Sequence, residues 1–156
     1  MTTDVKSLII HLATDHAGFE HKEIAKEWLL EAGYEVIDHG ASEFNPEDDF
    51  PDFIRLAAKA IAEDSEENKA IIFGGSGQGE AMMANRFPKV RAAVYYGGSP
   101  EIVTLSREHN DANVLSLGAR FISPSEMKEV IKLWLDTEFT NVFKYQCRND
   151  KLDVIE

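Results

Sequence analysis

Residues 71–80 have the sequence Ile71-Ile72-Phe73-Gly74-Gly75-Ser76-Gly77-Gln78-Gly79-Glu80, in which an apolar run meets a glycine-rich turn. The apolar run indicates a buried strand, and the Ala-Met-Met-Ala segment after Glu80 indicates a helix. Glycines let the backbone approach a ligand closely, and a helix start leaves several N–H groups without partners. The turn therefore predicts an anion site at the positive end of a helix dipole.

Glu80 is an unexpected residue in such a turn, because a bound phosphate or enediolate would repel its carboxylate. One explanation is compensation of the helix dipole, a surface effect of about 0.3–1 kcal/mol. A capping box does not explain it, since Glu80 lies four residues after Ser76 rather than three. The other explanation is a chemical role for the acid, and both remain open at this point.

The same turn lacks the pattern of two common nucleotide-binding motifs. It matches neither the dinucleotide fingerprint nor the lysine-containing phosphate loop. A smaller phosphate or oxyanion is therefore the expected ligand.

Strand-like and helix-like segments alternate along the whole chain. We expect strands at 8–13, 35–38, 70–73, 91–95 and 114–117, and helices at 18–32, 53–62, 80–85, 100–108, 123–135 and 140–155. Parallel strands need long crossovers, which these helices supply. The pattern predicts a single domain over residues 1–156, an α/β doubly wound, Rossmann-like fold. We expect its five-stranded parallel sheet to carry helices on both faces and a C-terminal helix.

The net charge of −12 argues against a nucleic-acid partner, which would require a basic face. No apolar run approaches membrane-spanning length, and the first seven residues lack the hydrophobic region of a signal peptide. The lone Cys147 excludes an internal disulfide framework and favours a reducing cytoplasm. The same charge means that a phosphorylated substrate would need a local cluster of cations.

Three polar groups follow predicted strands and should meet at the carboxyl edge of the sheet, where ligands bind in such folds. They are residues 15–18, 74–80 and 118–120. Asp15 has two explanations, as a helix cap or as a ligand of sugar hydroxyls, with His16 then facing a phosphate or ring oxygen. The long acidic loop at 39–52 has the composition of a solvated loop, although loops of that length are often functional.

His109 lies between a predicted helix and a predicted strand, at the amino edge of the sheet. It is either a surface cap or a residue that serves the site of a neighbouring subunit. Lys144 and Arg148 are four residues apart and would share a helix face, as a solvated pair or as the required cations. Three other histidines, His11, His21 and His39, have no evident partners, so we expect them to be structural. Cys147 has no evident base beside it, which disfavours a thiolate nucleophile.

These residues resemble the B-type ribose-5-phosphate isomerase family, which includes the galactose-6-phosphate isomerase subunits. The resemblance covers nearly the whole chain in order. It rests on the motifs Thr14-Asp15-His16-Ala17-Gly18, Asp49-Phe50-Pro51-Asp52, Gly75-Ser76-Gly77-Gln78-Gly79, Ala84-Asn85-Arg86, Arg107-Glu108-His109-Asn110, Asn113-Val114-Leu115 and Gly118-Ala119-Arg120.

The resemblance implies aldose–ketose isomerisation of a sugar phosphate through an enediolate, without metal or cofactor. One branch of the family uses a cysteine directly after the third strand, and this chain has Gly74 there. The other branch uses a glutamate at the helix start, which implies that Glu80 is the base. Ser76 would assist proton transfer at the substrate oxygens, and the N–H groups of residues 77–80 (Gly77, Gln78, Gly79 and Glu80) would hold the enediolate.

The resemblance also assigns the substrate contacts. His109 would open the sugar ring with Asn110 beside it, Asp15 would contact hydroxyls, and His16 and Arg120 would hold the phosphate. Lys144 and Arg148 would reach the phosphate from a partner subunit, which implies a homodimer or a dimer of dimers with shared sites.

Three positions depart from the family pattern. Phe50 replaces a tyrosine and Tyr145 replaces a histidine, while Lys144 replaces an arginine and so exchanges a bidentate fork for a point charge. The expected reaction is the interconversion of ribose 5-phosphate and ribulose 5-phosphate. The alternatives are a hexose 6-phosphate substrate, or a non-catalytic sugar-phosphate sensor, which would have no need of Glu80 or His109.

Overall fold

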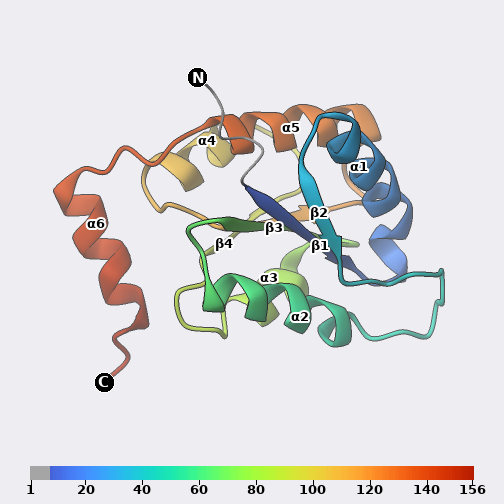
Figure 1. Ribbon diagram of the computed structural model, residues 1–156, viewed down its shortest axis with the longest axis horizontal. Helices are drawn as coiled ribbons and strands as arrows, with labels where there is room; N and C mark the ends of the chain where they lie inside the picture. Colours follow the sequence, from blue (N-terminus) through green and yellow to red (C-terminus); the bar gives the residue numbers. More distant parts are fainter. Residues whose placement is uncertain (1–7) are drawn as a thin grey trace.

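A five-stranded parallel sheet forms the centre of the computed structural model, which describes residues 8–156 (Figure 1). The first seven residues, where the sequence predicts no hydrophobic signal region, lie outside the described residues. The strands, in chain order, are β1 (Ile9–Thr14), β2 (Glu35–Asp38), β3 (Asn68–Gly74), β4 (Ala92–Tyr95) and β5 (Val114–Gly118). Their order across the sheet is β2-β1-β3-β5-β4, which confirms the predicted parallel α/β fold.

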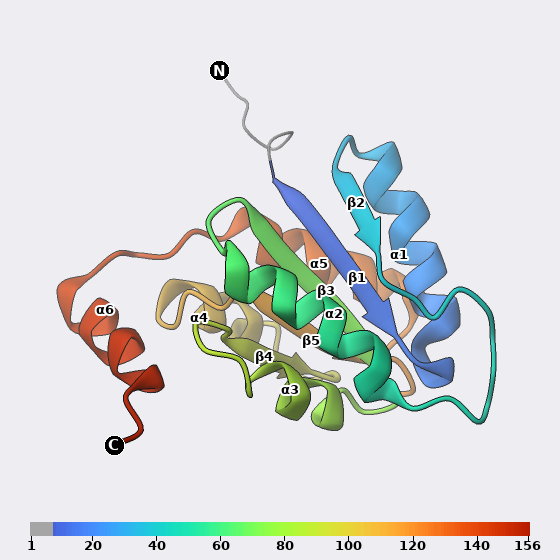
Figure 2. The ribbon, with the colours of Figure 1, turned by 60° about the horizontal axis from the view of Figure 1, so that its bottom comes forward.

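Helices cover both faces of this sheet, as the sequence predicts (Figures 1 and 2). One face carries α1 (Phe19–Glu31), α4 (Glu101–Glu108) and α5 (Pro124–Asp136), and the other carries α2 (Phe50–Glu63) and α3 (Gln78–Ala84). The C-terminal helix α6 (Phe143–Asp150) extends away from the sheet on the side opposite the start of α1. Two short 3-10 segments, η2 (His16–Gly18) and η3 (Lys151–Asp153), precede α1 and follow α6.

Alternate residues of β3 enter different hydrophobic clusters, which explains why this strand is apolar along most of its length. Ile71 and Phe73 belong to the cluster under α1, α4 and α5, whereas Ala70 and Ile72 belong to the cluster under α2 and α3. A strand covered on both faces has no solvent-facing side, so its apolar residues run consecutively. Fully burying each isoleucine or phenylalanine contributes about 1.5–3 kcal/mol.

The strand order of the sheet reverses between β1 and β3. This topological switch point places a crevice at the carboxyl ends of these two strands. From the neighbouring strands β1 and β3 the chain proceeds to opposite sides of the sheet, to β2 and to β4. Ligands bind at this switch point in open α/β sheets. The residues after β1 and β3 therefore lie where the fold favours a ligand.

Helix α2 begins at Phe50, three residues earlier than the predicted start at 53. The prediction treated Pro51 as part of the loop, but proline suits the first turn of a helix, where its missing N–H has no partner to lose. The predicted terminal helix at 140–155 is also shorter, and its regular part spans Phe143–Asp150. Helix α5 starts as expected, with the Ser123 side chain accepting a hydrogen bond from the Glu126 N–H.

The three histidines treated as structural do have partners, so the expectation of none was wrong. His11 bridges two elements, with Nδ1 at 2.9 Å from His39 Nε2 and Nε2 at 2.6 Å from Asn68 Oδ1. Burial, together with the His11 ring, lowers the pKa of His39. His21 Nε2 lies 2.9 Å from the carbonyl of Ile122. These contacts tie strands and loops together at positions where the sequence offers no local pattern.

Candidate functional site

The glycine-rich turn after β3 folds as a tight link into α3. Gly77, the residue that precedes α3, has a φ of 81°, in the left-handed region that favours glycine. Its carbonyl accepts hydrogen bonds from the Ser116 hydroxyl at 2.7 Å and from the Ala81 N–H at 3.2 Å. The turn is thus fixed between β5 and α3, and the start of α3 faces the carboxyl edge of the sheet. The Gln78 N–H donates to Ser76 Oγ at 3.3 Å.

Glu80 is buried in this turn, with an exposed fraction of 5%. Its carboxyl group lies against the Cα of Gly74, in the space that a side chain at position 74 would occupy. Burial raises the pKa of Glu80 above its ordinary value of 4.5, the backbone N–H of Glu80 opposes this rise, and the Asp15 carboxylate adds to it. A carboxylate held out of water with a raised pKa is suited to accept a proton near neutral pH.

Asp15 has the first of the two roles that the sequence left open, that of a cap. Its Oδ1 accepts a hydrogen bond from the Ala17 N–H at 2.9 Å and so caps the 3-10 segment after β1. The same carboxylate is close enough to Glu80 to raise the pKa of that group. The cap therefore also holds Asp15 beside the glycine turn.

Arg120, which follows β5, packs against the glycine turn. Its backbone N–H donates to the Gly75 carbonyl at 3.1 Å, and the neighbouring Ala119 N–H donates to the Gly74 carbonyl at 2.8 Å. A Cβ atom added to Gly75 would lie 2.9 Å from Arg120 Nη1, so the guanidinium packs directly on that glycine. A cavity of about 310 Å³ next to it is lined by His16, Ala17, Glu20, His21, Phe44, Ala119 and Arg120.

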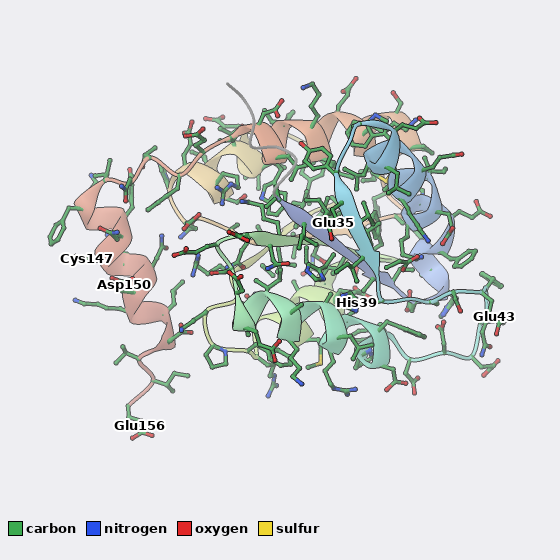
Figure 3. All side chains as sticks on the ribbon, viewed as in Figure 1. Glu35, His39, Glu43, Cys147, Asp150 and Glu156 are labelled. Atoms are coloured by element: carbon green, nitrogen blue, oxygen red, sulfur yellow. The ribbon has the colours of Figure 1, made fainter. Side chains whose placement is uncertain are left out.

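The acidic loop between β2 and α2 contributes Asp48, which the sequence analysis did not single out. Asp48 Oδ1 lies 2.7 Å from His16 Nδ1 and accepts a hydrogen bond from the His16 N–H at 3.1 Å. Phe44 lies edge-on to the same imidazole, with ring centroids 6.2 Å apart. The expectation of a merely solvated loop is therefore wrong for Asp48, whose side chain is held inside, whereas Phe44 stays exposed. Figure 3 shows His39 at the beginning of this loop and Glu43 farther out on it, and Glu43 is exposed.

Phe50, at the first position of α2, covers the glycine turn. A Cβ atom added to Gly79 would lie 2.7 Å from Phe50 Cζ, so the ring packs on the backbone of the turn. This contact joins the loop side of the site to α3. The aromatic ring supplies an apolar wall there, and no hydroxyl.

A second group of predicted residues lies at α4 and α6. His109 ends α4, and its ring stacks on Tyr145 with centroids 4.3 Å apart. Lys144 Nζ and Arg148 Cζ lie 5.3 and 5.9 Å from the centroid of the same Tyr145 ring. The carbonyl of His109 accepts a hydrogen bond from Asn149 Nδ2 at 3.1 Å. Asn110 Nδ2 in turn donates to Asn149 Oδ1 at 3.3 Å.

The structure thus brings the predicted residues together in two groups rather than one. The sheet-edge group contains Asp15, His16, Ser76, Gly77, Gln78, Gly79, Glu80 and Arg120, and the helix group contains His109, Asn110, Lys144 and Arg148. Helix α6 and the start of α1 lie on opposite sides of the sheet (Figures 1 and 2). Within one chain the helix group is therefore remote from Glu80. Cys147 also lies on α6, away from the glycine turn (Figure 3).

One group of possible metal-binding side chains occurs in the described part of the chain. The donor atoms of Asp15, His16 and Asp48 all lie within 4.8 Å of one another. The 2.7 Å contact of His16 Nδ1 with a carboxylate oxygen requires a proton between them, and the Arg120 charge acts on the same imidazole. We therefore interpret the three as a hydrogen-bonded cluster and not as metal ligands. Among residues 8–156, no helix has the length and apolarity needed to cross a membrane.

Comparisons with known proteins agree with the geometry. Residues 10–152 match the family model described as Ribose/Galactose Isomerase. Ribose-5-phosphate isomerase B of Mycobacterium tuberculosis (strain ATCC 25618 / H37Rv) is 34% identical over 144 residues, which cover 92% of this chain and 86% of that protein. The probable ribose-5-phosphate isomerase B of Mycoplasma genitalium is 35% identical over 146 residues, covering 94% of each chain.

Two solved structures have the same fold at similar identity. The crystal structure of ribose-5-phosphate isomerase B from Mycoplasma genitalium with bound ribulose 5-phosphate has a TM-score of 0.90 and 34% identity, covering 96% of each chain. A ribose 5-phosphate isomerase from Thermotoga maritima has a TM-score of 0.87 and 34% identity, covering 95% of this chain and 99% of that one. The family model and these relatives span nearly the whole described sequence. The chain belongs to the ribose/galactose isomerase family.

Proposed function

We propose that this protein interconverts ribose 5-phosphate and ribulose 5-phosphate, with Glu80 as the base that moves the proton. The observation that carries the proposal is the buried Glu80 carboxyl group against the Cα of Gly74, at the carboxyl edge of the sheet. The match to a ribose-5-phosphate isomerase B that binds ribulose 5-phosphate supports the choice of sugar.

The reaction needs one base and stabilised negative charge on two oxygens. Glu80 removes the C2 proton of the aldose, and the electrons of that C–H bond form the enediolate. Return of the same proton to C1 gives the ketose, while Ser76 assists the proton exchange between the two oxygens. The start of α3 stabilises the enediolate, because its dipole and N–H groups are oriented before the charge develops.

The pKa of Glu80 must suit this role. An ordinary carboxyl group is too acidic to be an effective base at neutral pH. Burial raises the pKa of Glu80, and the neighbouring Asp15 carboxylate raises it further. We expect the acid limb of the pH–rate profile to lie above the range of an ordinary glutamate, with activity lost as the pH falls through it. A profile with its acid limb at or below that ordinary range would contradict the assignment.

The phosphate needs more cations than the sheet-edge group supplies. That group holds Arg120 and His16, but also the acids Asp15, Asp48 and Glu80. We infer that Lys144 and Arg148 from a second copy complete the phosphate site, and that His109 and Asn110 of that copy open the ring. Their position on and beside the outlying α6 supports a homodimer, or a dimer of dimers, with shared sites.

Turnover with a panel of pentose and hexose phosphates, followed by proton exchange at C2, tests the function. We expect ribose 5-phosphate to be the preferred aldose, because the related Mycoplasma genitalium enzyme binds ribulose 5-phosphate. Glu80→Gln should lose isomerisation about 10²–10⁴-fold and still bind the phosphate ligand. Undiminished turnover in this variant would refute the mechanism, and binding without turnover in the unaltered protein would favour the sensor alternative.

Mixing two inactive variants tests the shared site. Glu80→Gln subunits and His109→Ala subunits should recover about a quarter of full activity, because random pairing leaves one intact site in half of the dimers. Mixed dimers that form without recovering activity would place both residues in one chain's site.

The lone Cys147 suits a reducing cytoplasm, which we propose as the compartment.

A further inference from the structure

Asp48 is a second acid in an unexpected place, beside the cavity that His16 and Arg120 line. A carboxylate at a phosphate site opposes binding, and the chain already carries a net charge of −12. Its side chain is nevertheless held inside, with an exposed fraction of 8%. Among residues 8–156, Asp48 Oδ2 has no hydrogen-bond partner. Within these residues the carboxylate accepts its hydrogen bonds through Oδ1, and both come from His16.

The loop that carries Asp48 is fixed by its own hydrogen bonds. The Asn45 side chain accepts from the Glu47 N–H at 3.0 Å, and the Asn45 carbonyl accepts from the Asp48 N–H at 3.1 Å. At the beginning of the loop, the Gly40 carbonyl accepts from the Thr14 N–H at 2.8 Å, and the Thr14 carbonyl accepts from the Ala41 N–H at 2.9 Å. The loop is thus attached to the end of β1 at Thr14, two residues before His16. Asp48 therefore contacts His16 from a loop that is held in place by hydrogen bonds.

The two contacts from Asp48 determine which nitrogen of His16 faces the ligand. An ionised carboxylate can only accept, so Nδ1 at 2.7 Å must carry a proton. Nε2 is then left for the cavity, since among residues 8–156 it has no hydrogen-bond partner. In the neutral ring Nε2 would present a lone pair to a phosphate oxygen and repel it. In the charged ring it presents an N–H donor and a positive charge.

The charges around His16 favour the charged ring. The hydrogen bond to Asp48 raises the pKa of His16, burial lowers it, the charges of Asp15 and Asp48 raise it, and Arg120 lowers it, with a net rise above 6.5. Glu20 and His21 are the other titratable residues that line the same cavity. With the acids nearest, the imidazolium form extends to higher pH than in a free histidine.

We propose that Asp48 is a positioning residue that keeps His16 doubly protonated, with Nε2–H directed at the phosphate group of the substrate. This inference rests on the proposed function, because it names the phosphate of that substrate as the ligand. Asp48 acts through His16 and does not touch the reacting carbons. It adds a cation to the phosphate site while its own charge stays turned toward the imidazole.

Three variants separate the charge of Asp48 from its hydrogen bond to His16. Asp48→Asn keeps an acceptor oxygen for His16 but removes the charge, and Asp48→Ala removes both. Glu47→Gln is the matched control, since it removes one charge from the adjacent, exposed position of the same loop. An NMR titration of the full-length protein measures the pKa of the His16 ring without any substrate. The His16 signal is assigned by its loss in the His16→Gln variant.

We expect Asp48→Asn and Asp48→Ala to lower the titration midpoint of His16, and Glu47→Gln to leave it within a few tenths of a pH unit. A lowering of one unit would raise the KM ratio of Asp48→Asn to the unaltered protein with pH, from about one below both midpoints to about tenfold above both. The value of kcat should change less than about twofold, since the enediolate contacts are untouched. Asp48→Ala should show the larger KM effect, because its ring is also free to turn.

An unchanged midpoint would overturn the inference, and so would a KM ratio independent of pH. A lower KM in Asp48→Asn would overturn it as well, because Asp48 would then act only by repelling the phosphate. Inorganic phosphate separates this test from that of the proposed function, since its binding requires no isomerisation. If ribose 5-phosphate is not turned over, the function fails, and the Kd ratio for inorganic phosphate still decides the role of Asp48.

Discussion

The sheet-edge group and the helix group hold their residues in different ways. Glu80 is buried, its carboxyl group fills the space above Gly74, and the turn that carries it is bonded to β5. Lys144 and Arg148 are exposed on α6, a helix that extends from the sheet and packs their charges around Tyr145. We call Glu80 with its turn the buried group, and Lys144 with Arg148 the exposed group. The buried group is packed within one chain, whereas the charges of the exposed group are available for another surface.

The difference suggests a division of the chemistry. Proton transfer needs a base with a raised pKa, which only a dry, closed surrounding supplies. Phosphate recognition needs cations, and exposed cations cost little to keep charged before the ligand arrives. A chain with a net charge of −12 therefore benefits from carrying its base inside and its extra cations on a projecting helix.

Gly74→Ala should break the buried group most strongly. The new methyl group would take the space of the Glu80 carboxyl group and displace the base. We expect kcat to fall about 10²-fold or more, since misplacing a catalytic group by about 1 Å can cost that much. Steady-state turnover of ribose 5-phosphate measures it. The double variant Gly74→Ala/Glu80→Gln should be no slower than Glu80→Gln alone, and additive losses would mean that Gly74 acts independently of Glu80.

Arg148→Ala should affect the exposed group alone. The loss of a charge-assisted contact to phosphate should raise KM about tenfold and leave kcat nearly unchanged. The increase should shrink at high salt, which screens exposed charges. Lys59→Ala, a control on α2 with a side chain 66% exposed, should leave KM unchanged. If Arg148→Ala changed kcat instead, the exposed group would take part in proton transfer.

Glu80→Gln should stabilise the fold at neutral pH, although it abolishes activity. A raised pKa in the folded state means that the folded protein binds the proton more tightly than the unfolded chain. The free energy of unfolding therefore falls as pH rises from the unfolded pKa of about 4.5 through the raised folded value. Above both values, the neutral amide avoids the cost of a buried charge, so we expect a Tm increase of about 2–4 °C.

Melting curves at pH 4 and pH 7.5 check this prediction. The stabilisation should largely disappear at pH 4, where the unaltered carboxyl group is mostly protonated in both states. A lower Tm of Glu80→Gln at pH 7.5 would contradict the prediction. It would mean that neighbouring groups stabilise the ionised Glu80 enough to offset its desolvation.

Asn149→Ala should have the smallest effect and tests how α6 is held. Asn149 is buried, donates to the His109 carbonyl and accepts from Asn110 Nδ2, so it links α6 to the end of α4. The variant removes both bonds, each of which contributes about 0.5–1.5 kcal/mol. We expect a two- to threefold rise in KM, about what a small loss of preorganisation costs, with kcat retained. Gln146→Ala, an exposed neighbour on the same helix, is the control.

Much of the fold was predictable because local patterns and the sheet agree. The strand at Glu35–Asp38 was predicted with the observed bounds, and the glycine turn was placed correctly between β3 and α3. The start of α2 was missed because Pro51 is compatible with both a loop and a first helical turn. Asp48 was missed because its importance depends on a contact with a residue 32 positions away, which no local pattern indicates.

The sequence by itself determined the parallel α/β fold, the family and the residue types available for proton transfer. Periodicity and glycine placement are properties of neighbouring positions, and the order of motifs is a property of the chain itself. All three can be identified without knowing which distant segments come into contact. Only the tertiary structure decided that the Glu80 carboxyl group fills the space above Gly74, that Asp48 holds His16, and that His109 joins Lys144 and Arg148 around Tyr145. These are contacts between distant segments, and packing alone brings them within reach.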